Sequence, residues 1–235
     1  MTDVAVHSQP AYILHQQNYS ESSLIIDALT QDFGRISLIA KGVRKAKSKT
    51  IGILRPFMGL SMSFLGKAEL KTLTDVEQIG SAHELKGLAL YCGFYVNELV
   101  CNFLHKYDPH PEVFENYQVC LSGLQQEANI ENALRQFEFN LLENSGYGVQ
   151  LDYDIANEKL IEPPKKYRFN TGEGLIEDVN GLFSGSALLA MQQRQFHDSR
   201  VLTEAKMLMR MVIDSHLQGK PLRSRAVIND IFKRL

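Results

Sequence analysis

The sequence predicts an α+β protein, with an N-terminal five-stranded β-barrel of the OB type followed by an α-helical domain that carries a small β-hairpin insertion. Two observations lead to this prediction. Short apolar and β-branched runs separated by polar breaks fill the first 80 residues, as in successive strands. From His83 onward, apolar residues recur with the spacing of amphipathic helices. We therefore expect a barrel domain over residues 1–80 and a helical domain over residues 81–235.

The first domain contains five segments with the composition of strands, at residues 11–17, 23–30, 34–42, 57–66 and 68–80. Asp32 and Gly34 supply turn chemistry before the third segment, and Gly66-Lys67 predicts a tight turn before the fifth. A long connection joins the third segment to the fourth. This strand count and this long connection are typical of an OB barrel, and a small SH3-like barrel is the alternative.

Helices are expected where apolar residues recur every three or four positions, at residues 82–107, 111–126, 130–146, 184–195 and 198–219. The first must stop before Asp108-Pro109, because proline disfavours the helical conformation of the residue that precedes it. Asp198 or Ser199 is expected to cap the helix that begins there. A short basic helix closes the chain.

The insertion at about residues 147–183 lacks helical periodicity. Its second half reads "EPPKKYRFNTGEGLIEDVNG", in which turn-forming residues separate two short runs with strand character. We expect a small hairpin that turns around Thr171-Gly172.

The formal net charge of −2 is distributed very unevenly along the chain. Residues 1–71 carry nine basic against five acidic side chains, residues 72–164 carry four against fifteen, and residues 165–235 carry twelve against seven. Such segregation suggests different partners for different faces of the molecule.

The stretch from residue 35 to residue 55 contains seven basic side chains and no acidic one. Glycine, serine and threonine interrupt it, which indicates a flexible connection and not a charged helical face. A polyphosphate is the natural partner of such a stretch, because each neutralised phosphate releases counterions. The predicted DNA-binding residues are Arg35, Lys41, Arg44, Lys45, Lys47, Lys49 and Arg55.

Aromatic side chains of the first domain could provide stacking platforms for bases. Tyr19 is the best candidate, because its neighbours Asn18 and Ser20 are polar. Phe57 and Phe64 are expected to pack in the core instead.

The sequence shows no recognisable catalytic signature, so we expect a binding protein that is not an enzyme and needs no cofactor. Cys92, Cys101 and Cys120 lie in apolar helical contexts, which favours buried, reduced thiols over zinc ligands. Asp152 and Asp154 begin like a calcium loop, but the glycine that this loop requires at its sixth position is missing. No metal site is predicted.

The longest apolar run, residues 87–104, is interrupted by Asn97, Glu98 and Asn102. It is too polar for a membrane span and is more typical of a core helix. We expect no membrane association. The predicted reduced thiols favour a cytoplasmic protein, and the predicted DNA binding would associate it with the nucleoid.

Several motifs resemble those of the RecO family of bacterial DNA repair proteins. They include "AYILHQQNYSESSLIIDALTQDFGRISLIAKGVRKAKS", "LRPFMGLSMSFLGKAELKTLTDVE", "LYCGFYVNELV", "ALRQFEFNLLENSGYGV", "YRFNTGEGLI" and "GKPLRSR", in this order along nearly the whole chain. The resemblance implies a recombination mediator that binds single- and double-stranded DNA and anneals complementary strands. With its partner RecR, such a protein helps to load RecA onto DNA coated with single-stranded-DNA-binding protein (SSB). An RNA-binding or ribosome-associated OB protein is the alternative.

Two details of the resemblance concern particular residues. Many family members carry a four-cysteine zinc site in the region that matches residues 147–180, where this chain has no cysteine, so it resembles the zinc-free proteobacterial branch. The family also binds the acidic, Phe-ended tail of SSB through its helical domain. Arg135 is the only basic residue between Lys106 and Lys159, and it could form an internal salt bridge or anchor that tail. We predict tail binding by Arg135 and, second, by Lys106.

Overall fold

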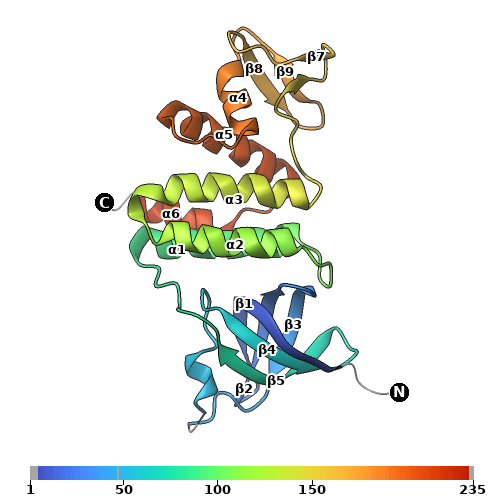
Figure 1. Cartoon of the computed structure of the whole chain (residues 1–235), viewed down its shortest axis with the longest axis vertical. Helices are drawn as coiled ribbons and strands as arrows, with labels where there is room; N and C mark the ends of the chain where they lie inside the picture. Colours follow the sequence, from blue (N-terminus) through green and yellow to red (C-terminus); the bar gives the residue numbers. More distant parts are fainter. Residues whose placement is uncertain (1–4, 47, 233–235) are drawn as a thin grey trace. The chain divides into compact units, whose positions relative to one another are not determined.

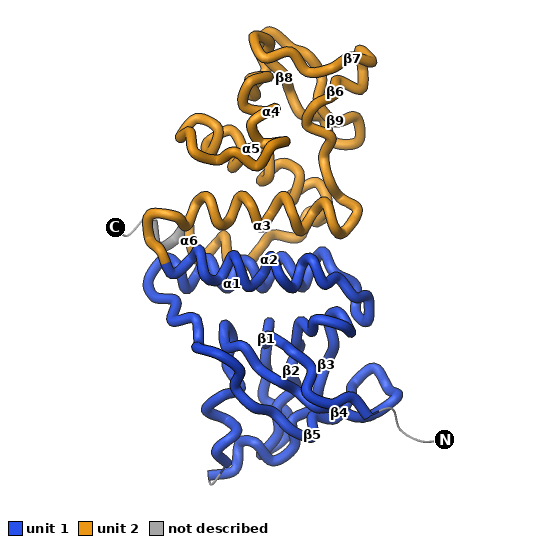
Figure 2. The backbone as a smooth tube through the Cα atoms, viewed as in Figure 1, with its two compact units in different colours: residues 1–125 blue, residues 126–235 orange. Residues whose placement is uncertain are grey.

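The computed structural model describes residues 5–46 and 48–232, with the backbone alone for residues 229–232. The chain forms two compact units, Met1–Gln125 and Gln126–Leu235, which Figure 2 colours separately. Lys47, one of the predicted DNA-binding residues, lies outside the described residues. Among the residues described, no helix combines the length and the apolar composition that crossing a membrane requires.

Unit 1 begins with a closed barrel of β1 (Ala5–Tyr19), β2 (Ser23–Thr30), β3 (Gly34–Ala40), β4 (Leu60–Leu65) and β5 (Leu70–Gln78) (Figure 1). The order around the barrel is β1-β2-β3-β5-β4. Strands β3 and β5 pair in parallel, and the other neighbours pair in antiparallel fashion. This connectivity is that of an OB barrel, which confirms the predicted fold class.

Strand β1 is longer than the predicted segment 11–17 because it serves two neighbours. Its first part pairs with β4 and its later part with β2, and the register shifts between Val6 and Gln9 and again between Ile13 and His15. At the first shift Ser8 has a positive φ of 52°, and its amide donates to Ser63 Oγ at 3.1 Å. Bulges of this kind bend a strand, which lets β1 curve around the barrel.

The barrel core follows from alternation along the strands, which places every second side chain inside. It contains Leu24, Ile26 and Ala28 of β2, Ile36, Leu38 and Ala40 of β3, and Leu60, Met62 and Phe64 of β4. The prediction that Phe64 packs in the core is therefore confirmed.

Two helices complete unit 1, α1 (Gly87–Phe103) and α2 (Pro111–Leu124), and a buried polar chain ties them to β1. Asn97 donates from Nδ2 to the carbonyl oxygen of Leu14 at 2.9 Å, and it accepts from the hydroxyl of Tyr117 at 2.6 Å. The ring of Tyr117 also packs against that of Tyr12, with 5.1 Å between the two ring centroids. Because buried polar groups need such partners, the contact fixes the helices against the barrel. The domain boundary at residue 80 stays a prediction.

Helix α1 begins five residues later than the predicted residue 82. Residues 82–86 run alongside the segment before β4 instead, where the amide of His83 donates to the carbonyl oxygen of Phe57 at 3.0 Å. Phe57 is buried, as predicted, and its ring meets that of Phe94 on α1 at a centroid distance of 5.2 Å.

Unit 2 contains α3 (Ile130–Asn144), α4 (Gly185–Gln192), α5 (Ser199–His216) and α6 (Arg223–Phe232). Its insertion forms two small sheets, β6 (Tyr153–Asp154) with β7 (Lys159–Leu160), and β10 (Phe183–Ser184) with β8 (Lys166–Asn170) and β9 (Gly174–Glu177). The predicted hairpin is confirmed, since β8 and β9 turn at residues 171–173. Asp198 caps α5 by accepting from the amide of Arg200 at 2.7 Å, as predicted.

A fully buried carboxylate joins the two small sheets. Asp154 accepts from the amide of Asn157 at 3.0 Å, from the side-chain amide of Asn157 at 2.8 Å, and from the amide of Glu177 at 2.9 Å. The Asp154 carboxylate, which belongs to the calcium-like pattern in the sequence, therefore accepts hydrogen bonds from within the protein.

Asp154→Asn is expected to destabilise these sheets by about 1–3 kcal/mol, because an amide nitrogen cannot accept from the N–H groups that the carboxylate satisfies. Protection of the Asn157 and Glu177 amides against hydrogen exchange at neutral pH measures the effect. Asp152→Asn makes the same change two residues away and serves as the control. Equal protection in both variants would contradict this role of Asp154.

The same carboxylate predicts a loss of stability in acid. Burial would raise the pKa of Asp154, but the hydrogen bonds from Asn157 and Glu177 outweigh it and lower the pKa below its ordinary value. A carboxyl whose pKa is lower in the folded state stabilises the fold at pH values above its unfolded-state pKa of about 4. This contribution disappears as the pH falls through the folded-state pKa. In the wild type, protection of the Asn157 and Glu177 amides should therefore decrease when the pH is lowered below about 4. The Asp154→Asn variant should not show this decrease.

Candidate nucleic-acid interface

The segment of residues 41–55, called the basic loop from here on, leaves β3 and leads towards β4. Its described cations are all exposed: Lys41, Arg44, Lys45, Lys49 and Arg55. Two apolar residues, Val43 and Leu54, turn inward and join the barrel core. The loop is thus held to the barrel at both ends, and its charges face solvent between these points.

Hydrogen bonds within and around the loop fold it into turns. The amide of Ser48 donates to the carbonyl oxygen of Lys45 at 2.9 Å, and a single 3₁₀ turn, η1 (Thr50–Gly52), follows. No α-helix forms among the described residues of the loop, which agrees with the predicted irregular connection.

Tyr19 and Arg44 lie at the same end of the barrel. The amide of Arg44 donates to the carbonyl oxygen of Ser22 at 2.9 Å, and its guanidinium donates to the carbonyl oxygen of Ser20 at 3.0 Å. Tyr19, which directly precedes this turn, is 48% exposed. An exposed ring near an exposed cation is a combination that proteins use to bind single-stranded nucleic acid.

Arg35 differs from the cations of the basic loop because it lies between the barrel and the helices of unit 1. Its guanidinium donates to the carbonyl oxygen of Cys101 at 2.8 Å, in the last turn of α1, where a cation is favourable. Its carbonyl oxygen accepts from the amide of Tyr107 at 3.0 Å. A role for Arg35 in DNA binding stays a prediction.

The two residues predicted to bind the SSB tail both have internal partners. Lys106 donates to Glu69 at 2.7 Å, and this bond lowers the pKa of Glu69. Arg135 is only 5% exposed, and its Nη2 lies 2.6 Å from Oε1 of Glu138, three residues later on α3. The internal salt bridge that the sequence allowed for Arg135 is therefore present, and its role in tail binding stays a prediction.

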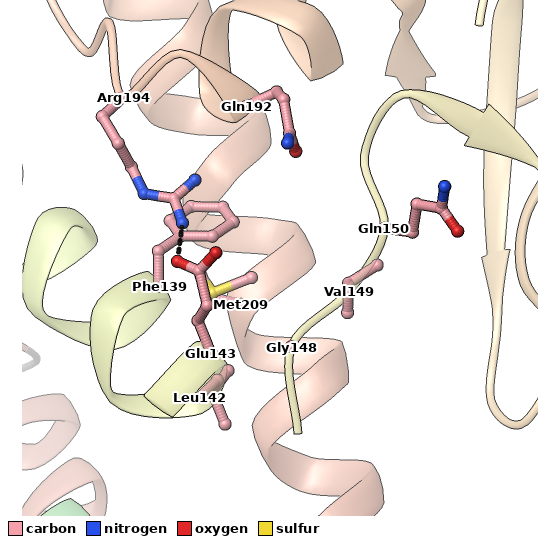
Figure 3. Close-up of a pocket in the computed structure, with 9 residues that line it drawn as sticks. All are labelled: Phe139, Leu142, Glu143, Gly148, Val149, Gln150, Gln192, Arg194 and Met209. Atoms are coloured by element: carbon pink, nitrogen blue, oxygen red, sulfur yellow. Dashed lines mark hydrogen bonds and ion pairs between the residues drawn. The ribbon is translucent and has the colours of Figure 1, made fainter. Parts of the chain in front are cut away.

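A pocket of about 220 Å³ lies in unit 2 between α3, α5 and the segments that follow α3 and α4 (Figure 3). Phe139, Leu142 and Met209 provide apolar walls. Arg194 lies over the ring of Phe139, 4.9 Å from its centroid, and pairs with Glu143 at 2.6 Å. The sequence did not indicate this combination, because Arg194 follows Phe139 by 55 positions along the chain.

The described residues contain no group of three or more His, Cys, Asp or Glu side chains that could hold a metal ion. Cys92 and Cys120 are buried, and Cys101 is partly exposed. Burial raises the pKa of the Cys101 thiol and outweighs the opposite effect of Arg35.

An OB barrel with an exposed basic loop, followed by helices, places the chain in the class of OB-fold proteins, whose barrels commonly bind oligonucleotides or oligosaccharides. Comparison with known families identifies the particular member of this class. Residues 1–82 match the model "Recombination protein O N terminal", and residues 85–226 match "Recombination protein O C terminal". The chain therefore belongs to the RecO family, as the sequence motifs predicted.

Individual relatives match nearly the whole length of this chain. The "DNA repair protein RecO" of Pasteurella multocida is 42% identical over 229 residues, which cover 96% of this chain and 95% of that protein. The proteins of the same name from Paraburkholderia xenovorans and Burkholderia pseudomallei are each 38% identical, over 98% of this chain and 79% and 86% of their own lengths.

Proposed function

We propose that this protein is a DNA-binding recombination mediator in DNA repair that performs no covalent chemistry. It binds single- and double-stranded DNA, anneals complementary strands and, together with RecR, helps to load RecA onto SSB-coated DNA. Membership of the RecO family and the repair function in the names of its relatives support this proposal. The observation that carries it is the basic loop, with five described cations, all exposed, and no carboxylate among them.

The loop explains how annealing could proceed without an energy source. Two DNA strands repel each other through their phosphates, and a surface that neutralises both backbones lowers this repulsion. Tyr19 would hold a base by stacking, which does not depend strongly on sequence. Contacts to phosphates carry no sequence information, and stacking tolerates any base, so we expect little sequence preference.

Annealing of SSB-coated complementary strands tests the proposal directly. The protein should accelerate annealing without nucleotide or metal, and competition should show whether RNA or single-stranded DNA is preferred. A strong preference for RNA would favour the alternative of an RNA-binding OB protein. Cleavage of labelled DNA in the presence of magnesium would contradict the absence of covalent chemistry.

We also propose that unit 2 binds the acidic, Phe-ended tail of SSB. Such a tail needs an apolar pocket with a cation beside it. The pocket beside Phe139 offers this combination, with Arg194 at its rim. Arg135 and Lys106 remain the candidates that the sequence suggested, although each already has a carboxylate partner.

Binding of an SSB-tail peptide separates these candidates. We expect Arg194→Ala to lower peptide affinity about tenfold or more, because it removes the cation and leaves Glu143 to repel the acidic peptide, at about 1.4 kcal/mol per factor of ten. Binding of naked DNA should not change. Arg210→Ala, which removes an exposed arginine from α5, is the control. If the Arg194 variant binds the peptide normally and Lys106→Ala does not, the tail site lies in unit 1.

A further inference from the structure

A second pocket, of about 300 Å³, lies in unit 1 where the end of the basic loop meets the segment that precedes α1. It is lined by Arg55, Phe57, Met58, His83, Leu85 and Lys86, among others. One hydrogen bond joins its two walls, from the amide of His83 to the carbonyl oxygen of Phe57 at 3.0 Å. A second, from the amide of Leu85 to the carbonyl oxygen of His83 at 3.0 Å, forms a turn within the segment that precedes α1. Its volume is at the lower end of the range for small-ligand sites.

The charged groups of this pocket favour an anion. Arg55 and Lys86 are both exposed, and the one carboxylate among the lining residues is Glu84. Glu84 lies 3.5 Å from Lys86, but both side chains are more than three-quarters exposed, at 76% and 84%, so their attraction is weak. Helix α1 starts at Gly87 without a side-chain cap or an acidic residue in its first turn, which adds to the positive potential.

The apolar part of the pocket is rigid. Phe57, a bulky residue, holds a φ of 65°, and this conformation persists only where the surroundings fix it. Its ring packs so closely on α1 that a Cβ added to Gly93 would lie 2.9 Å from its edge. Half-buried Pro56 and Ala82, with the small exposed parts of Met58 and Leu85, complete the apolar lining next to the two cations.

We propose that this pocket binds one nucleotide of a single DNA strand that continues from the basic loop. The inference rests on the proposed DNA binding and extends it to a defined site. A nucleotide has the two parts that the pocket separates, since its base suits the apolar surface and its phosphate suits Arg55 and Lys86. Arg55 is also the last cation of the basic loop, so one strand can contact both the loop and the pocket. An acidic peptide would use the cations but has no such connection with the loop.

Two exposed side chains of opposite charge, Lys86 and Glu84, allow a test, because their variants should change DNA affinity in opposite directions. Lys86→Ala should weaken binding of a 20-nucleotide oligo(dT) about fivefold at 0.1 M salt and lower its salt slope by about 0.7, the value for one phosphate contact. Glu84→Gln should strengthen binding. Lys67→Ala and Glu77→Gln change the same charges at exposed positions of the barrel outside the pocket lining, and they should have little effect.

Photo-crosslinking locates the strand in the unaltered protein. Oligo(dT) with one photoreactive thymine analogue should crosslink to peptides that contain residues 55–58 or 82–86. If no crosslink forms there and the four variants bind oligo(dT) with equal affinity, the pocket inference is wrong. This holds even if variants of the basic loop lose DNA binding. If the loop variants bind DNA normally, the proposed function itself fails. If Lys86→Ala loses binding of an acidic peptide while its DNA binding is unchanged, the inference is also wrong.

Discussion

Replacing Lys41, Lys45 and Lys49 with Ala is expected to lower the affinity for single-stranded DNA about a hundredfold at 0.1 M salt. Each lysine is exposed on the basic loop, and each phosphate contact contributes about 0.7 to the salt dependence of binding to a single strand. Three lost contacts should therefore reduce the slope of log affinity against log salt by about two. Fluorescence anisotropy with a labelled oligonucleotide at several salt concentrations measures both quantities.

The control for this variant must lose the same charge elsewhere. Lys67, Lys166 and Lys206 are exposed and lie outside the basic loop, so their combined change to Ala alters the net charge equally. Wild-type affinity and slope in the control, with the expected loss in the loop variant, would assign the contacts to the loop. If both variants lose affinity equally, the attraction is due to overall charge, and the loop is not a specific surface.

Glu138→Ala is expected to lower the free energy of unfolding of unit 2 by about 3–5 kcal/mol. The carboxylate of Glu138 is almost fully buried beside the guanidinium of Arg135, and its loss leaves that cation in the interior without its carboxylate. Breaking a buried ion pair from one side is costly because the remaining charge is no longer compensated. Chemical denaturation and hydrogen exchange over residues 130–144 measure the loss.

Removing both charges should restore much of this stability. The double variant Arg135→Met with Glu138→Leu replaces the ion pair with apolar side chains of similar size, which is often nearly neutral. The double variant also tests the prediction that Arg135 binds the SSB tail, because it removes the guanidinium without leaving a buried charge. A folded double variant that binds the SSB-tail peptide normally would show that Arg135 is structural. If instead Glu138→Ala is as stable as wild type, the pair is not buried in solution.

The barrel could be predicted because its strands carry local signals. Strand β2 matches the predicted range 23–30, since its apolar residues alternate and turn residues bound it. The first part of β1 was missed because residues 5–10 are mixed in polarity, and only pairing with β4 makes them a strand. The late start of α1 was also missed, because residues 82–86 are held by a contact with Phe57 that local sequence does not reveal.

The candidate sites were visible to different degrees. The basic loop appears in the sequence as a stretch with several basic residues and no acidic one, and the structure places its described cations on the surface. The partner of Arg135 was also within reach, since Glu138 follows at the spacing of neighbours on a helix. Contacts such as Arg35 with Cys101, or Arg194 with Phe139, join residues that are more than 50 positions apart, and only the fold brings them together.

The parallel pairing of β3 with β5 has a consequence for how the basic loop can change. Three residue pairs, from Ser37 with Leu70 to Ile39 with Thr72, close the barrel around a chain segment that contains the whole loop. The entropy cost of closing such a segment grows only with the logarithm of its length, so doubling the length costs about 0.6 kcal/mol. We therefore expect insertions or charge changes between Val43 and Leu54 to leave the strand register intact, so that the barrel can carry loops of different length and charge.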